Sequence, residues 1–451
     1  MLILLVCVCL LGTISSVLML QISAKKGVFP LGIISGILSL GTLLIVVPEN
    51  VQLTNGSAVT VLQKAGGISI TKLVEVAPRA NELLAVCLFA FIVGEALVVA
   101  LTGPRQLLRD RSEIWNPAHT RRFVGLAMLF GVASVVILRL GVGVSPVNRG
   151  TQQGIGPVTS GTWLLMFAAI ALLQDRNAFS AKVRWFLILV ALGADLSQLN
   201  RSPIILLGCY LLIRVAQRIS AGRIGFRALV VGIVVAYALS VSVSVINLWR
   251  GSIIHHTQST SVLSDIEKVW TNPIGALPQN ANLDTFNGAM FVTLLEGSGI
   301  TESAREWEVA LTTYVPSEIW HSKPLPLSDT LSHDYLHYGN SGIFLSGAGF
   351  ASITLGGLPE AGVLWFLVGI LGSLVLRRTI GMRFDYLWMA LVLYLLVAMW
   401  YQGDAFAIYF VTSLMVLFGI FAWITRPGTP RLKGRRTTSQ VTRDLAPLRN
   451  H

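Results

Sequence analysis

The sequence predicts an all-α polytopic membrane protein with about 11 transmembrane helices and one large extracytoplasmic loop. Hydrophobic residues make up 53% of the 451 residues, charged residues only 12%, and the mean hydropathy is +0.69. The apolar residues are grouped in runs that suit helical spans of about 20 residues. Basic residues form short clusters between these runs. Soluble, disordered and fibrous proteins are therefore excluded.

The apolar runs place the spans in order along the chain. They lie at residues 1–20, 28–48, 82–102, 123–141, 161–174, 184–200, 202–216, 226–247, 346–376, 385–401 and 405–424. The first run lacks the basic start and cleavage site of a signal peptide, so we expect it to be retained. The ninth is long and contains Gly347, Gly349, Gly356, Gly357 and Pro359. Because glycine and proline interrupt helices, this run predicts a re-entrant segment followed by a helix.

The chain thus divides into residues 1–247 with eight spans, a loop at 248–345, residues 346–425 with three spans, and a basic tail at 426–451. Most Lys and Arg follow every second span or lie in the tail. The positive-inside rule then places the N-terminus outside the inner (plasma) membrane and the tail, which we expect to be disordered, in the cytoplasm. The net charge of +12 is therefore an orientation signal, and no nucleic-acid partner is expected.

The loop at 248–345 is acidic overall and contains most of the histidines, namely His255, His256, His321, His333 and His337. Long loops are usually functional or disordered. This loop has many aromatic residues and a candidate amphipathic helix at 282–296, so we expect it to fold and to be partly helical. Two interpretations remain open: a catalytic loop at the outer surface, or polar residues gathered where their exposure costs little.

Three features follow one another along the chain. Arg201 stands between two apolar runs, and the loop contains Tyr314-Val315-Pro316-Ser317-Glu318-Ile319-Trp320-His321-Ser322-Lys323-Pro324. The chain then returns to an apolar run through Gly356-Gly357-Leu358-Pro359-Glu360-Ala361-Gly362. Over about residues 120–425 this order resembles the Wzy-type O-antigen and capsule repeat-unit polymerases. The sequence departs from that pattern at Ser317, where many relatives have a basic residue, and at Pro359, where a glycine is usual.

The resemblance implies a GT-C-like membrane glycosyltransferase. Such an enzyme transfers a polyprenyl-diphosphate-linked oligosaccharide to the terminal hydroxyl of another lipid-linked repeat unit on the extracytoplasmic face. The products are O-antigen, capsule or exopolysaccharide chains. No nucleotide sugar, cofactor or metal is expected. The implied partners are the lipid-linked oligosaccharide, membrane lipids, a flippase and a chain-length regulator.

The leaving diphosphate needs positive charge beside it, and arginine can donate two parallel hydrogen bonds to a phosphate. Arg201 is the first candidate, followed by Arg250, Arg149 and Lys323. Each arginine could instead be an ordinary residue of the membrane interface, and Lys323 could simply cap a turn. Trp320 could stack on a sugar or anchor the loop among the headgroups.

The attacking hydroxyl needs a general base, for which His333, Asp334 and His337 are candidates. On a helix, the two histidines would share a face. The same spacing could bind a metal ion, but no third ligand is identifiable, so a base is the preferred interpretation. Glu360 is a rival candidate, because a carboxylate at the membrane boundary is costly unless it is paired or used.

Two alternatives to a polymerase remain. An O-antigen ligase would use the same donor but a different acceptor. A flippase or transporter for lipid-linked oligosaccharides would bind them without reaction, and its central cavity should be lined with basic residues along several spans. Glu95 lies deep in the third predicted span, and the sequence offers no partner for it.

Overall fold

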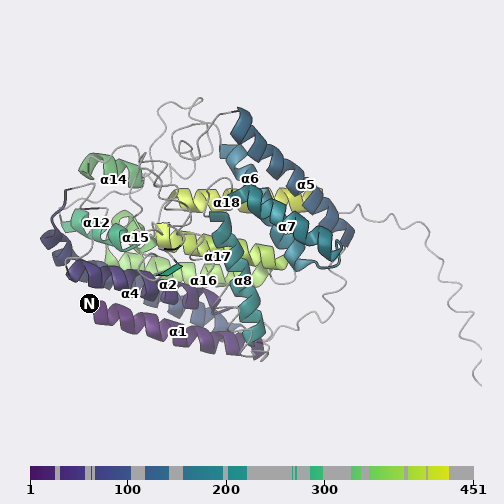
Figure 1. Ribbon diagram of the computed structural model, residues 1–451. Coiled ribbons are helices and arrows are strands. Elements are labelled where there is room, and N and C mark those ends of the chain that lie inside the picture. Colours follow the sequence, from purple (N-terminus) through teal and green to yellow (C-terminus); the bar gives the residue numbers. More distant parts are fainter. Residues whose placement is uncertain are drawn as a thin grey trace, which may run out of the picture.

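The computed structural model of the chain is a bundle of α-helices (Figure 1). It describes residues 1–25, 31–55, 67–102, 117–141, 156–196, 202–220, 285–297, 327–336, 345–379, 384–402 and 405–425, with a few isolated positions between them. No β-strand occurs in these ranges. The predicted span at 226–247 and the tail from residue 426 lie outside them.

Most of the helices follow the predicted apolar runs in order. The N-terminal half supplies α1 (Leu2–Lys25), α2 (Ile33–Thr54), α4 (Ile70–Leu101), α5 (Pro117–Val136), the π-helical turn η1 (Ile137–Gly141), α6 (Gly156–Gln174), α7 (Ala181–Leu196) and α8 (Ser202–Ser220). The C-terminal half supplies α12 (Thr285–Gly297), α14 (Leu327–Leu336), α15 (Gly347–Leu355), α16 (Leu358–Thr379), α17 (Asp385–Gln402) and α18 (Ala405–Ile424).

Four of the described helices, α1, α2, α4 and α16, are long and apolar enough to cross a membrane. Shorter apolar segments occur in α6, α8, α17 and α18. Large apolar side chains also cover the outside of the bundle: Leu11, Leu129, Leu189 and Leu371 are each more than half exposed. Such a surface suits lipid and would aggregate in water, so the chain is a helical membrane protein.

Helix α4 begins well before the predicted span at 82–102. The Ser69 side chain accepts a hydrogen bond of 3.4 Å from the Lys72 N–H and so caps the helix start. Pro78 lies inside this first part. The exposed Arg79 and Glu82 form an ion pair of 2.7 Å. The apolar run therefore located the most apolar part of α4 but not the more polar part at its start.

Glycines let α4 and α16 approach closely. A Cβ on Gly94 of α4 would collide with the carbonyl oxygen of Phe366, and a Cβ on Gly369 of α16 would collide with that of Phe91. Small residues at helix contacts are typical of membrane bundles, where close packing takes the place of the hydrophobic effect. Beside this contact the Phe91 and Trp365 rings are 6.1 Å apart.

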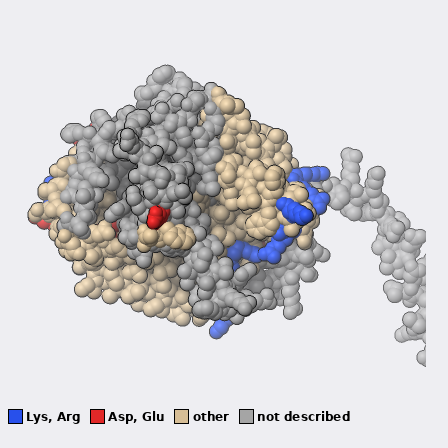
Figure 2. Space-filling view, viewed as in Figure 1, with Lys and Arg blue, Asp and Glu red and all other residues tan. Residues whose placement is uncertain are grey.

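One end of the bundle gathers the basic residues. The Nη1 of Arg377, in the last turn of α16, donates to Thr102 Oγ1 after α4 over 3.4 Å. Gln174 at the end of α6 donates to Asp385 at the start of α17 over 2.9 Å. We call this the basic end; its described members are Lys25, Arg121, Arg122, Arg176, Lys182, Arg184, Arg214, Arg377 and Arg378. Figure 2 shows most of the Lys and Arg visible on this face at that end.

Further contacts at the basic end tie the start of α5 to the end of α18. His119 Nε2 lies 3.0 Å from the Thr425 hydroxyl, and the His119 and Phe384 ring centroids are 5.3 Å apart. Arg121 donates through Nε to the Ala178 carbonyl oxygen. The clusters predicted from the sequence to share one side of the membrane therefore meet at one end of the structure, as far as it is described.

Helices α12, α14 and α15 lie at the opposite end (Figure 1). The predicted interruption of the ninth span is confirmed, because α15 ends at Leu355 and α16 begins at Leu358. Gly356 and Gly357 have φ values of 105° and 143°, which favour glycine. The Gly356 N–H closes α15 with a hydrogen bond of 3.1 Å to the Ser352 carbonyl oxygen.

Candidate functional site

The described residues contain only part of the site predicted from the sequence. Arg149, Arg201, Arg250, Trp320, Lys323 and His337 lie outside them. The backbone of His333 belongs to α14, but its side chain is not described. Asp334 is exposed on α14, and Glu360 is exposed in the first turn of α16. The convergence of the arginines, the lysine and the base on a diphosphate therefore stays a prediction.

Helix α12 shows that part of the predicted loop folds into the bundle. The helix predicted at 282–296 is observed at Thr285–Gly297. It is not amphipathic, because nearly every side chain from Phe286 to Leu295 is buried. A helix that is apolar all round belongs inside a protein or a membrane. It packs against α4 and α15, so this segment is part of the folded core at the end opposite the basic end.

Helix α15 starts inside this core. Ser346 has a φ of 59°, and its side chain accepts a hydrogen bond of 3.0 Å from the Gly349 N–H. The Trp365 indole donates to the Gly347 carbonyl oxygen over 3.1 Å. A Cβ on Gly347 would collide with Trp365 and with the Met399 carbonyl oxygen. Only glycine allows α15 to begin this close to α16 and α17.

A carboxylate and a hydroxyl meet where α12 and α15 cross. The Ser352 hydroxyl donates to Glu296 Oε1, and both residues lie on the sides of their helices that face each other. The pair is partly buried. Gly349, one turn before Ser352, leaves room for Val292 one turn before Glu296. We call Glu296 and Ser352 the α12–α15 pair.

An ionised carboxylate held by a hydroxyl donor can accept a proton from a substrate hydroxyl, which is the role of a general base. Glu296 is not among the candidate bases predicted from the sequence. The sequence does contain a signal for it, because Glu296 is the first charged residue after the apolar stretch from Phe286 to Leu295. What the sequence could not indicate was the second helix, which brings Ser352 to it from 56 positions away.

Asn287, on another side of α12, adds a buried amide to this end of the bundle. The residue is 9% exposed, and its Oδ1 has no hydrogen-bond partner among the residues that the structure describes. A buried acceptor without a donor costs free energy unless water or a ligand satisfies it.

Elsewhere in the bundle, the Trp400 indole donates to Thr42 Oγ1 over 3.2 Å and packs edge-on against Trp365, with ring centroids 4.9 Å apart.

Within the described part of the chain, no group of three or more His, Cys, Asp or Glu side chains is placed to hold a metal ion. Among the Lys and Arg whose side chains the structure describes, none is buried. The buried charged residues of the described chain are the acids Glu95, Asp175, Asp195 and Asp385. The buried charged groups of the described chain are therefore all acidic.

Comparison of the chain with protein-family models, with curated proteins and with solved structures gave no match.

Proposed function

We propose that the protein polymerises polyprenyl-diphosphate-linked oligosaccharide repeat units on the extracytoplasmic face of the inner membrane. The observation that carries this proposal is the placement of α12. A segment of the long loop is buried in the bundle at the end opposite the basic residues, and it holds Glu296 against Ser352. An enzyme that acts on a membrane-bound donor needs a group fixed in this way near the membrane surface.

In this proposal the full protein has 11 spans in a GT-C-like arrangement. The N-terminus is extracytoplasmic, the tail is cytoplasmic, and the end that bears α12 and α15 faces outward. The positive-inside rule supports this orientation, because the described basic clusters share the other end. A flippase and a chain-length regulator are the expected protein partners.

The reaction joins two lipid-linked chains. Arg201, with Arg250, Arg149 and Lys323, stabilises the departing diphosphate. A base removes the proton from the acceptor hydroxyl as it attacks the donor sugar, and the bond from that sugar to the diphosphate breaks. Glu296 joins His333, Asp334, His337 and Glu360 as a candidate for this base. Trp320 stacks on a sugar ring.

The buried charges favour an enzyme over a flippase. A carrier for an anionic lipid needs cations along its path, but the described interior carries acids and no Lys or Arg. An O-antigen ligase remains the nearest variant, because it differs only in the acceptor. A polymerase lengthens the donor chain on a second lipid-linked unit, whereas a ligase requires a different acceptor molecule.

The test uses the purified full-length protein in vesicles with a synthetic polyprenyl-diphosphate oligosaccharide. We expect a ladder of longer lipid-linked chains from the wild type and none from Arg201→Ala. Arg184→Ala is the matched control, because Arg184 is a partly exposed arginine at the basic end, where it donates to the Arg176 carbonyl oxygen. Transfer of the lipid across the bilayer without lengthening would instead identify a flippase and overturn the proposal.

A further inference from the structure

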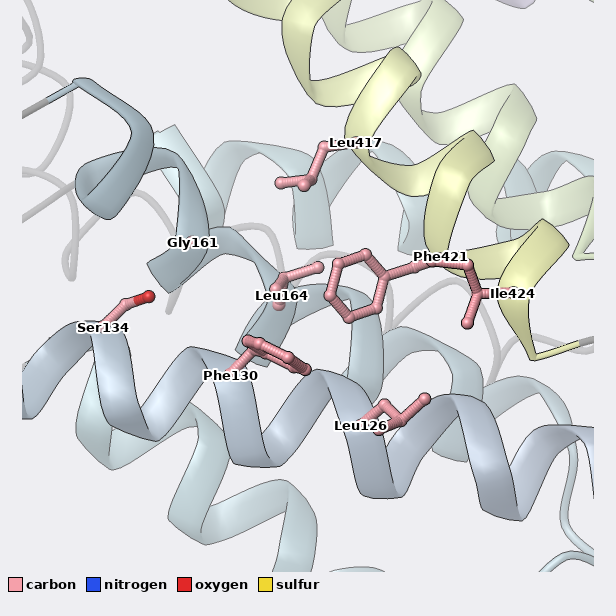
Figure 3. Close-up of a pocket in the computed structure, with 8 residues that line it drawn as sticks. All are labelled: Leu126, Phe130, Ser134, Gly161, Leu164, Leu417, Phe421 and Ile424. Atoms are coloured by element: carbon pink, nitrogen blue, oxygen red, sulfur yellow. The ribbon is translucent and has the colours of Figure 1, made fainter.

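An apolar groove of about 380 Å³ lies between α5, α6 and α18 (Figure 3). Its lining residues are Leu126, Phe130, Ser134, Gly161, Leu164, Leu417, Phe421 and Ile424. The side chains of Phe130 and Phe421 point toward one another from α5 and α18, with ring centroids 5.6 Å apart. The Ser134 hydroxyl is the only polar side-chain group in the lining. The groove therefore suits a hydrocarbon chain.

The groove opens toward the lipid-facing surface. Two of its lining residues, Phe130 and Ile424, are 51% and 57% exposed. The neighbouring Leu129 and Trp423, which do not line it, are 65% and 67% exposed. In a membrane protein, apolar side chains exposed on the outside of the bundle face the bilayer. Lipid chains are therefore the molecules that can enter the opening.

Arg122 stands at one mouth of the groove. Arg122 precedes Leu126 by one helical turn, and Phe130 follows by one more, so all three lie on the same side of α5. Arg122 is exposed and makes no hydrogen bond or ion pair with any residue that the structure describes. Its neighbour Arg121 is already bonded to Ala178. The same mouth lies at the basic end, because Ile424 precedes Thr425, the partner of His119.

We propose that this groove binds one acyl chain of an anionic phospholipid, whose phosphate is held by Arg122. Along α5 the lining from Leu126 to Ser134 is about 12 Å long. One leaflet contributes about 15 Å of hydrocarbon, so an acyl chain from the leaflet at the basic end can fill the groove. The proposal does not depend on the enzymatic activity, and the groove lies apart from the α12–α15 pair.

The test is native mass spectrometry of the full chain in mild detergent, titrated with phosphatidylglycerol or phosphatidylcholine of identical acyl chains. We expect the wild type to retain phosphatidylglycerol more tightly. Arg122→Gln should lower that affinity by about fivefold and leave phosphatidylcholine unaffected, the effect of one basic residue at a membrane surface. Arg378→Gln is the matched control, because Arg378 is exposed at the basic end on α16, away from the groove.

Filling the groove tests the acyl chain separately. Leu126→Trp should lower the affinity for both lipids by at least about tenfold, because buried methylenes are displaced. Leu417→Trp fills the same groove from α18 and should give the same loss. Leu129→Trp adds equal bulk to the exposed face of α5 and should leave lipid binding unchanged.

Three results would overturn the proposal. The first is equal binding of the two lipids by the wild type. The second is the same lipid loss in Leu129→Trp as in the two groove variants, which would indicate unspecific contact with bulk lipid. The third is a wild-type dimer without bound lipid that dissociates in Leu126→Trp. This result would show that a second copy of the protein occupies the groove.

Discussion

Glu95 of α4 caps the first turn of α2 through Ser35. The Ser35 N–H donates to Glu95 Oε2 over 2.9 Å, and the Ser35 hydroxyl donates to the same oxygen. Oε1 accepts a bond of 2.8 Å from the N–H of Gly32, the N-cap residue, which has no side chain to perform this role. The carboxyl oxygens also face the positive end of the α2 dipole. The sequence alone indicates no partner for Glu95, but in the fold both of its carboxyl oxygens accept hydrogen bonds from the start of α2.

Replacement of Glu95 should destabilise the bundle. Glu95→Ala leaves the N–H groups of Gly32 and Ser35 buried without an acceptor, at an expected loss of about 2–3 kcal/mol. The measurement is the apparent Tm of the purified protein in detergent. Glu75→Ala is the control, because Glu75 is an exposed carboxylate on the same helix. Equal Tm values for the two variants would show that Glu95 is not needed as a cap.

The contact between α4 and α16 should tolerate no side chain at its glycines. Gly369→Ala places a methyl group against the Phe91 carbonyl oxygen, and Gly94→Ala does the same against that of Phe366. Separation of the helices should lower stability by roughly 1–3 kcal/mol. Gly125→Ala is the control, since a Cβ there meets nothing within 4 Å. Thermal unfolding distinguishes them, and equal stability of all three variants would exclude a close helix contact.

The α12–α15 pair gives a prediction about activity. Glu296→Gln keeps an oxygen that can accept the Ser352 hydroxyl, so the contact between the helices should survive. Loss of the base should slow polymer formation by about 100-fold or more at unchanged Tm. Glu75→Gln, an exposed carboxylate on α4, serves as the control. A wild-type rate in Glu296→Gln would leave the role of base to His333, Asp334, His337 or Glu360.

Membrane orientation can be tested without any substrate. Reporter fusions after Ser259, in the long loop, and after Arg435, in the basic tail, should report opposite faces of the membrane. The tail fusion should be cytoplasmic, because the basic clusters remain on the side of synthesis. Two fusions on one face would mean an even number of spans between the two positions and would change the sidedness of the proposed site.

The sequence by itself determined the helical membrane fold class, the order of most apolar helices and the end at which basic residues gather. It did so because hydropathy and charge are local: a bilayer acts on about 20 residues at a time, and each cluster is oriented close to its own span. The interruption at Gly356 and Gly357 was readable for the same reason, since a backbone with positive φ selects glycine locally.

Only the tertiary structure decided which residues are partners. The pairing of Glu95 with Ser35 joins positions 60 apart, and that of Glu296 with Ser352 joins positions 56 apart. Each depends on how two helices cross, and a run of apolar residues carries no record of which neighbour it will pack against. The same reason explains why α12 was expected to be amphipathic and is instead buried nearly all round. Its surroundings come from α4 and α15, which lie far from it in the sequence.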